Sequence, residues 1–171
     1  MDYLETKERL EPGTRVNVLG NRLVLIAIAS LDEQLADPWQ ALGSLTENQR
    51  LAMAFVDAVP AGLYGKVALQ KLDLWDGVEA HVVQTDNVRS ALKLVALGEA
   101  SYGVVYETDT VAEPRVNVLA VFPEDSHPPI VYPAAAISGR LNNAAEEFLT
   151  YLHGPVAGHL FKEQGFSLLL E

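Results

Sequence analysis

The stretch DAVPAGLYGKVALQKL, residues 57–72, predicts an extended approach followed by a helix that begins at Pro60. Proline suits the first helical position because the N–H that it lacks would have no partner there. The first turn, Pro60-Ala61-Gly62, offers no side-chain donor or acceptor, so no strong capping residue marks the helix start. Two interpretations are open: a helix started by proline with no ligand, or bare backbone N–H groups that face an anion.

Around this helix, apolar runs of strand length alternate with helical patterns. Strands are predicted at 14–19, 22–29, 51–56, 80–84, 102–106, 116–122 and 131–137, and helices at 38–45, 60–72, 88–97, 143–152 and 155–164. Residues 75–77 are predicted to be a connector and 123–129 a proline-rich loop. Helix 60–72 is expected to carry Leu63, Val67, Leu69 and Leu72 along one side. The alternation predicts parallel pairing and an α/β layered fold.

Ligands of such sheets collect where strands end and helices begin. Three positions fit this rule: the helix start at Pro60, the helix start at Val88, and Tyr106 at a strand end. Two helix N-termini and a tyrosine hydroxyl would together stabilise a dianion without Lys or Arg. Each position also has an alternative interpretation, since Asp86 or Asn87 could cap the second helix and the Tyr106 hydroxyl could bond locally.

Bulk composition excludes several classes of protein. With 171 residues, 49% hydrophobic and 20% charged, the chain can form one domain or two small lobes. The net charge of −11 argues against nucleic-acid binding, which needs a basic face. There are no cysteines, so disulfides and thiolate chemistry are excluded. The longest apolar run, 23–29, is too short to span a bilayer, and residues 1–15 have no apolar signal-peptide core.

Two groups of polar residues are candidates for catalysis or metal binding. Asp125, Ser126 and His127 could serve a small hydrolase, but adjacent residues rarely form a triad and a turn is the favoured interpretation. His153 and His159 are six residues apart, which does not match metal ligands at i and i+4 on a helix. We therefore predict no enzyme, no metal cation and no cofactor.

From about residue 1 to residue 166, the chain resembles the periplasmic molybdate-binding proteins of bacterial ABC transporters, and six segments carry the resemblance. They are LGNRLVLIA (19–27), VPAGLYGKVALQKL (59–72), DNVRSALKLV (86–95), GVVYETD (103–109), VFPEDSHPPIVYPAA (121–135) and FLTYLHGPVAGHLFKEQGF (148–166).

The resemblance implies a type II periplasmic binding protein fold. It implies a complete lobe at 21–130, with half of the oxyanion site, and a partial lobe built from 1–20 and 131–171, joined by two crossover strands. In that family uncharged groups hold the anion. Matched by motif, the donors on this chain are the backbone N–H groups of Ala61 and Val88 and the hydroxyl of Tyr106. The implied ligand is molybdate or tungstate, the partner an ABC permease, and the compartment the periplasm.

The chain also departs from the pattern of this family. Family members carry a signal peptide and an initial βαβα segment, with two ligand serines, ahead of the region that matches this chain. None of Ser30, Ser44, Ser90 and Ser101 matches those serine motifs. We therefore expect a fragment with an incomplete site, weak or absent binding, and uncovered edges that favour a dimer or a swapped arrangement. The alternative function is a ligand-sensing effector domain of a transcription regulator, which normally follows a basic helix-turn-helix that this chain does not resemble.

Overall fold

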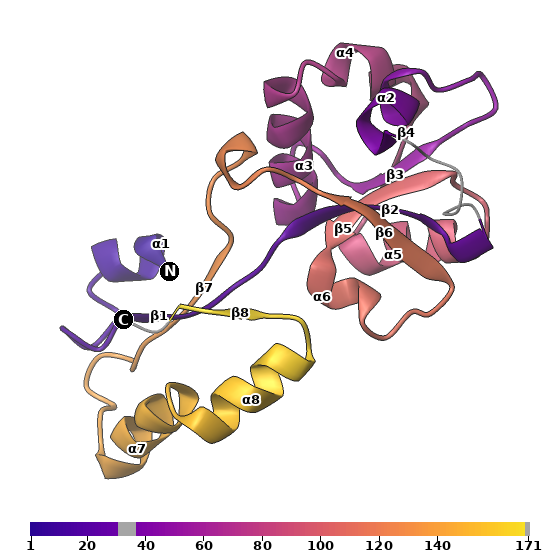
Figure 1. Cartoon of the computed structure of the whole chain (residues 1–171). Coiled ribbons are helices and arrows are strands. Elements are labelled where there is room, and N and C mark those ends of the chain that lie inside the picture. The colour runs from indigo at the N-terminus through magenta and orange to yellow at the C-terminus, as the bar shows by residue number, and fades with distance from the viewer. Residues whose placement is uncertain (31–36, 170–171) are drawn as a thin grey trace. The chain divides into compact units, whose positions relative to one another are not determined.

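The computed structural model describes residues 1–30 and 37–169 (Figure 1). The chain forms two compact units, one of Met1–Asn21 with Ile130–Glu171 and one of Arg22–Pro129. The backbone therefore passes between the units twice, after Asn21 and after Pro129. The interpretation of these units as a partial lobe and a complete lobe stays a prediction.

A five-stranded mixed sheet forms the centre of the unit Arg22–Pro129. Its order is β4-β3-β5-β2-β6, with bounds β2 Leu23–Ile28, β3 Leu51–Ala54, β4 Val82–Thr85, β5 Tyr102–Tyr106 and β6 Val116–Val121. Strand β3 runs parallel to β4 and β5, whereas β2 is antiparallel to both β5 and β6. The predicted parallel pairing is thus wrong for β2 and β6. A continuous apolar run such as β2 indicates burial on both faces, and it does not encode strand direction.

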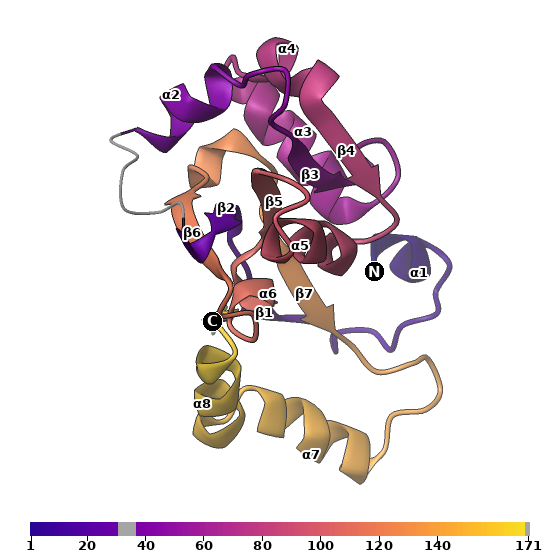
Figure 2. The same ribbon diagram turned by 90° about the vertical axis from the view of Figure 1, so that its right-hand side faces the viewer.

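Two helices cover opposite faces of this sheet, α3 (Pro60–Lys71) and α5 (Val88–Ala96) (Figures 1 and 2). Helix α5 packs against one face, and their shared core includes Val24, Ile26, Ala52 and Val105. Helix α3 packs against the other face, where Gly65 approaches the side chains of Met53 and Val104. Since side chains alternate along a strand, neighbours such as Ala52 and Met53 serve different helices.

Most residues on the buried side of α3 are small. Its buried positions are Ala61, Gly62, Gly65, Ala68 and Leu69. Leu63 and Val67, expected on the apolar side, are 44% and 43% exposed. A Cβ on Gly65 would lie 2.6 Å from Met53 Cε, so at this position α3 lies too close to the sheet for a larger side chain. The predicted apolar side is therefore wrong for Leu63 and Val67, whereas Leu69, which is also expected on that side, is buried.

The remaining elements of this unit are short. They are α2 (Pro38–Gly43), α4 (Trp75–Val78), η2 (Glu79–His81), α6 (Glu107–Thr110) and η3 (Glu124–Ser126). The Asp37 side chain caps α2 by accepting from the N–H groups of Trp39 and Gln40. The predicted connector at 75–77 is helical, and so is part of the predicted loop at 123–129.

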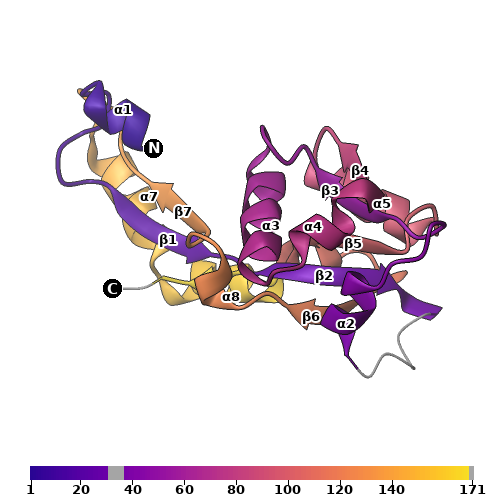
Figure 3. The same ribbon diagram turned by 90° about the horizontal axis from the view of Figure 1, so that it is seen from above.

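The other unit contains a three-stranded antiparallel sheet of order β7-β1-β8. Its elements are α1 (Asp2–Thr6), β1 (Val16–Gly20), β7 (Val131–Ala134), α7 (Asn143–Leu152), α8 (Pro155–Glu163) and β8 (Ser167–Leu168). Helix α8 packs beside β8 (Figure 1), and α7 contacts α8 (Figure 3).

Little of α7 and α8 is covered by the rest of the described chain. Helix α7 has no buried residue, and α8 buries only Ala157 and Gly158. Phe148 and Val156 are 60% and 61% exposed. Within the described ranges, none of the helices combines the length and apolar character that a membrane crossing requires.

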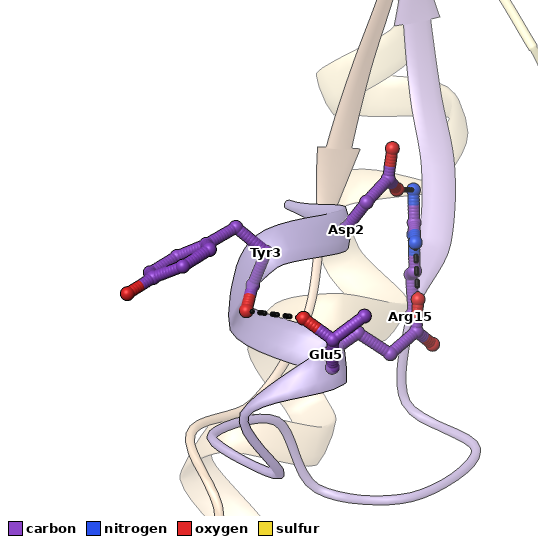
Figure 4. A network of polar contacts seen from close by, with 5 residues as sticks. Asp2, Tyr3, Glu5 and Arg15 are labelled. Carbon is purple, nitrogen blue, oxygen red and sulfur yellow. Dashed lines mark hydrogen bonds and ion pairs between the residues drawn. The ribbon is translucent and has the colours of Figure 1, made fainter.

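A polar network joins α1 to the start of β1. The Arg15 guanidinium donates to the carboxylates of both Asp2 and Glu5 (Figure 4). The hydrogen bond from Arg15 holds the pKa of Asp2 below its ordinary value. This exposed network fastens a short helix that has no buried residue of its own.

Candidate functional site: an edge of uncapped N–H groups

Three predicted positions lie at one edge of the five-stranded sheet. Strands β4, β3 and β5 are parallel neighbours, so their carboxyl ends share that edge. Helix α3 follows β3, helix α5 follows β4, and Tyr106 is the last residue of β5. Ala54 and Thr85, the last residues of β3 and β4, pair with each other. The structure therefore places Tyr106 at one strand end, and Ala61 and Val88 beyond the two neighbouring ones, within one unit.

Ala61 is the second residue of α3, and its helix start has no side-chain cap. The N-cap residue is Val59, whose carbonyl accepts from the Leu63 N–H at 2.9 Å. Across residues 1–30 and 37–169, neither the Ala61 nor the Gly62 N–H has an acceptor. Ala61 is only 2% exposed. Buried backbone donors are nearly always paired, so this donor is one that a ligand oxygen or a water would satisfy.

Gly62 shows why the first turn of α3 is made of small residues. A Cβ at this position would lie 2.3 Å from the Ala54 carbonyl oxygen and 2.4 Å from that of Phe55. Both atoms belong to the backbone and cannot move aside as a flexible side chain would. Glycine is therefore required by the close approach of α3 to the end of β3, whether or not a ligand binds.

Val88 is the first residue of α5. A side chain caps this helix, but the Val88 N–H has no acceptor among the described residues. The Asn87 side chain accepts from the Ser90 N–H at 2.9 Å. The Asp86 carboxylate accepts from the Asn87 amide at 2.8 Å and from the Ser90 hydroxyl at 3.0 Å. The two side chains expected to compete for the Val88 N–H are thus engaged elsewhere. The Val88 side chain packs against the core under α5.

Tyr106 is both the end of β5 and the N-cap of α6. Asp109 accepts from the Tyr106 N–H at 3.3 Å, and the Tyr106 side chain accepts from the backbone of Asp109. The local partner considered from the sequence is therefore present. A phenolic hydroxyl can accept one hydrogen bond and donate another.

Two cations of these elements, Arg89 and Lys66, lie beside carboxylates. Burial raises the pKa of Asp109, and this outweighs the opposing effects of the Tyr106 N–H and of Arg89, whose Nε lies 4.0 Å away. Lys66 of α3 lies 2.8 Å from Asp57. The donors described above are themselves neutral groups, which act as fixed dipoles.

Two residues at the end of β4 link the approaches to both helices, and sequence reasoning missed them. Gln84 accepts from the Val56 N–H at 2.9 Å, ahead of α3. The Thr85 hydroxyl lies 2.8 Å from the Asn87 carbonyl and 3.2 Å from the Met53 carbonyl. Their only signal in the sequence is a polar pair at the end of an apolar strand that precedes a capped helix.

The groups considered for catalysis and metal binding bond to other partners. The Ser126 hydroxyl donates to the Pro123 carbonyl at 2.6 Å, and His127 Nδ1 lies 2.8 Å from the Pro128 carbonyl. His153 contacts the Leu149 carbonyl, and His159 lies 3.3 Å from Glu163. In the part of the chain that the structure describes, no group of three or more His, Cys, Asp or Glu side chains is arranged to hold a metal ion.

Residues 1–167 match the model of a family described as bacterial extracellular solute-binding protein. The molybdate-binding protein ModA of Escherichia coli K12 is 42% identical over 170 residues, which are 98% of this chain and 66% of that protein. ModA of Haemophilus influenzae is 38% identical over 169 residues, with the same coverage. The chain thus spans just under two thirds of the length of these curated relatives.

Solved structures with the same fold include two binding proteins for molybdenum species. The substrate-binding domain of a putative molybdenum ABC transporter from Clostridium difficile has a TM-score of 0.85 and 29% identity, covering 98% of this chain and 72% of that one. The periplasmic molybdate-binding protein of Azotobacter vinelandii has a TM-score of 0.76 and 25% identity, covering 98% and 73%. These similarities confirm the predicted α/β fold of periplasmic binding proteins.

Proposed function

Because this chain belongs to the family of bacterial extracellular solute-binding proteins, we propose that it binds molybdate or tungstate for uptake by an ABC importer. Relatives named molybdate-binding proteins, at 42% and 38% identity, support the choice of ligand. The neighbour from a putative molybdenum ABC transporter supports the transport role. The proposal covers the activity of the whole binding protein, of which this chain matches about two thirds.

The proposed oxyanion donors are the backbone N–H groups of Ala61 and Val88 and the hydroxyl of Tyr106. The observation that carries this assignment is the Ala61 N–H, which is nearly buried and has no acceptor among the described residues. The first turns of α3 and α5 contribute partial positive charge at the same sheet edge. A tetrahedral oxyanion would accept hydrogen bonds there without any cation.

Neutral donors suit selection by size. The net charge of −11 opposes every anion alike at long range, and charge cannot separate molybdate from sulfate. The spacing of fixed N–H and O–H groups can do so, because it sets the oxygen-to-oxygen distance that fits. Three donors are few for a dianion, whose burial is costly without full hydrogen bonding. We therefore expect weak binding by this chain alone.

A thermal-shift titration tests the ligand. Molybdate, tungstate, sulfate and phosphate are added to the chain at matched ionic strength, because a ligand that binds the native state raises the melting temperature by mass action. We expect a rise with molybdate and tungstate only. Equal rises with all four anions would contradict the proposal, and no rise with any would contradict binding by the three donors of this chain alone.

A tyrosine variant tests the site. Tyr106→Phe removes one proposed donor and should reduce the molybdate-dependent rise. Tyr64→Phe is the matched control, because Tyr64 lies in α3 of the same unit with its ring beside His127. Tyr106 would be excluded as a donor if the two variants kept the same response as the parent.

The proposal includes a partner, a compartment and an absence of catalysis. As the solute-binding component, the protein would deliver its ligand to an ABC permease in the periplasm, the compartment named for the Azotobacter vinelandii neighbour. The anion would leave unchanged, so we propose no enzymatic reaction and no cofactor. The backbone partners of Ser126 and His127 support this view of the PEDSH segment.

Self-association is the last part of the proposal. Exposed apolar side chains of α7 and α8, chiefly Phe148, Tyr151, Val156 and Leu160, form a surface that a second copy or an exchanged segment could cover. Light scattering after size exclusion should show a dimer, and Phe148→Ser should shift it toward monomer. A monomeric parent at every concentration would contradict this part alone.

A further inference from the structure

The approaches to α3 and α5 are joined by hydrogen bonds from the last two residues of β4. Gln84 Oε1 accepts from the Val56 N–H at 2.9 Å. The backbone carbonyl of Thr85 accepts from the Phe55 N–H at 2.8 Å. Both acceptors therefore hold the segment that leads from β3 into α3, although β4 itself leads into α5.

The Thr85 hydroxyl completes the connection. Its oxygen lies 2.8 Å from the Asn87 carbonyl and 3.2 Å from the Met53 carbonyl. A hydroxyl carries one proton, so the two carbonyls share it and the nearer Asn87 carbonyl receives the stronger bond. Asn87 is the N-cap of α5, and Met53 lies in β3. One side chain thus contacts the elements that precede both helix starts.

The linked segment continues directly to Ala61. The Phe55 carbonyl accepts from the N–H groups of Ala58 and Val59, at 3.3 and 2.9 Å. Val59 is the N-cap of α3, and its carbonyl accepts from Leu63. Since α3 has no side-chain cap, these backbone bonds and their anchors at Gln84 and Thr85 fix the direction of the Ala61 N–H.

We propose that Gln84 and Thr85 are positioning residues that set the separation between the Ala61 and Val88 N–H groups and thereby the size of anion accepted. This inference rests on the proposed oxyanion function. Donors bind a ligand tightly and selectively when they are held in place before it arrives. Loss of either anchor would let the loop ahead of α3 move relative to α5, which would weaken binding and blunt the preference for the larger anion.

The test uses backbone amide signals, which report weak binding at each donor. The full chain labelled with ¹⁵N is titrated separately with molybdate and with sulfate, following Ala61 and Val88. The variants are Thr85→Val, which keeps the shape without the hydroxyl, Thr85→Ser, which restores the hydroxyl, and Gln84→Met. The control is Thr46→Val, which removes a 3.0 Å hydrogen bond to the Gln49 side chain ahead of β3.

In the parent, molybdate should shift both amides. Thr85→Val and Gln84→Met should weaken molybdate binding by about fivefold, the effect of one net hydrogen bond, and should lower the ratio of molybdate to sulfate affinity. Thr85→Ser should recover both values, and Thr46→Val should leave the ratio unchanged. A purely structural role would change stability without changing this ratio.

Two failures are distinguishable. If the parent binds molybdate at Ala61 and Val88 while Thr85→Val and Gln84→Met keep the parental ratio, the positioning role is overturned and the proposed function stands. If millimolar molybdate shifts neither amide of the parent, the proposed function fails, and the positioning role fails with it. Should Thr85→Val not fold, Gln84→Met decides the outcome, because Gln84 is exposed and its replacement leaves the core intact.

Discussion

At the scale of single residues, the close packing around Gly62 predicts that a larger residue at this position destabilises the protein. Gly62→Ala would place a Cβ within 2.4 Å of two backbone carbonyl oxygens, so α3 must shift away from β3. We expect a loss on the order of 2 kcal/mol in the free energy of unfolding, measured by urea denaturation. Gly77→Ala is the control, since the nearest atom to its Cβ is 3.9 Å away. Equal stability of Gly62→Ala and the parent would contradict the close approach.

The buried carboxyl group of Asp109 should make the stability of the protein depend on pH. Burial raises its pKa in the folded state above the ordinary 3.8, so the native state holds this proton more tightly than the unfolded state does. Asp109 therefore costs no stability below the ordinary pKa, and its cost is fully present above the raised pKa. Asp109→Asn removes the charge and keeps an acceptor for the Tyr106 N–H.

The stability gained by Asp109→Asn over the parent should accordingly grow as pH rises from about 3 to about 7. Urea midpoints at several pH values across this range provide the measurement. Asp76→Asn, at an exposed carboxylate of α4, is the comparison. A gain that is larger at the acidic end than at neutral pH would show that attraction to Arg89 outweighs burial.

At the scale of elements, the start of α2 depends on one side chain. Asp37 accepts from the N–H groups of Trp39 and Gln40 at 2.9 and 3.2 Å, and Pro38 occupies the first helical position. Asp37→Ala should lower the unfolding free energy by about 1 kcal/mol, whereas Asp37→Asn, which keeps the acceptor, should lose only a few tenths. If both variants lose the same amount, charge rather than capping is responsible.

Elements with strong local signals are the ones that sequence reasoning predicted well. Strand β5 (Tyr102–Tyr106) and helix α7 (Asn143–Leu152) have their predicted bounds, because apolar runs and caps mark both ends. Helix α6 (Glu107–Thr110) is four polar residues with no apolar stripe, and β8 (Ser167–Leu168) exists only by pairing with β1. Such elements depend on tertiary contacts, so no local sequence pattern predicts them.

The candidate site likewise has a part that the sequence predicts and a part that it does not. The placement of Ala61, Val88 and Tyr106 at one edge follows from parallel strands whose ends carry helix signals, a relation that sequence can express. The hydrogen bonds of Gln84 and Thr85 join residues about thirty positions apart. They depend on strand register, which becomes visible only after β3 and β4 are paired.

At the scale of the whole molecule, the two units differ in the size of the hydrophobic core that each contains. The largest fully buried side chains, including Phe122, Leu25, Met53 and Leu69, all belong to the unit Arg22–Pro129. Helix α7 of the other unit has no buried residue. Since local stability follows burial of apolar contacts, the units should open with different free energies even though they share one chain.

Amide hydrogen exchange followed along the whole chain tests this difference. We expect slow exchange in β2, β3 and β5 and much faster exchange in α7. The amides of α7 are protected only by the hydrogen bonds of the helix itself, because no residue of α7 is buried. If a second copy covers α7 and α8, their protection should increase when the protein concentration rises on the order of a hundredfold, because association stabilises the covered state by mass action. Protection of β5 should not change under the same conditions, which makes it the internal reference. Exchange in α7 that is as slow as in β5 at low concentration would contradict the unequal division of the core. Exchange in α7 that is fast at every concentration would contradict self-association through this surface.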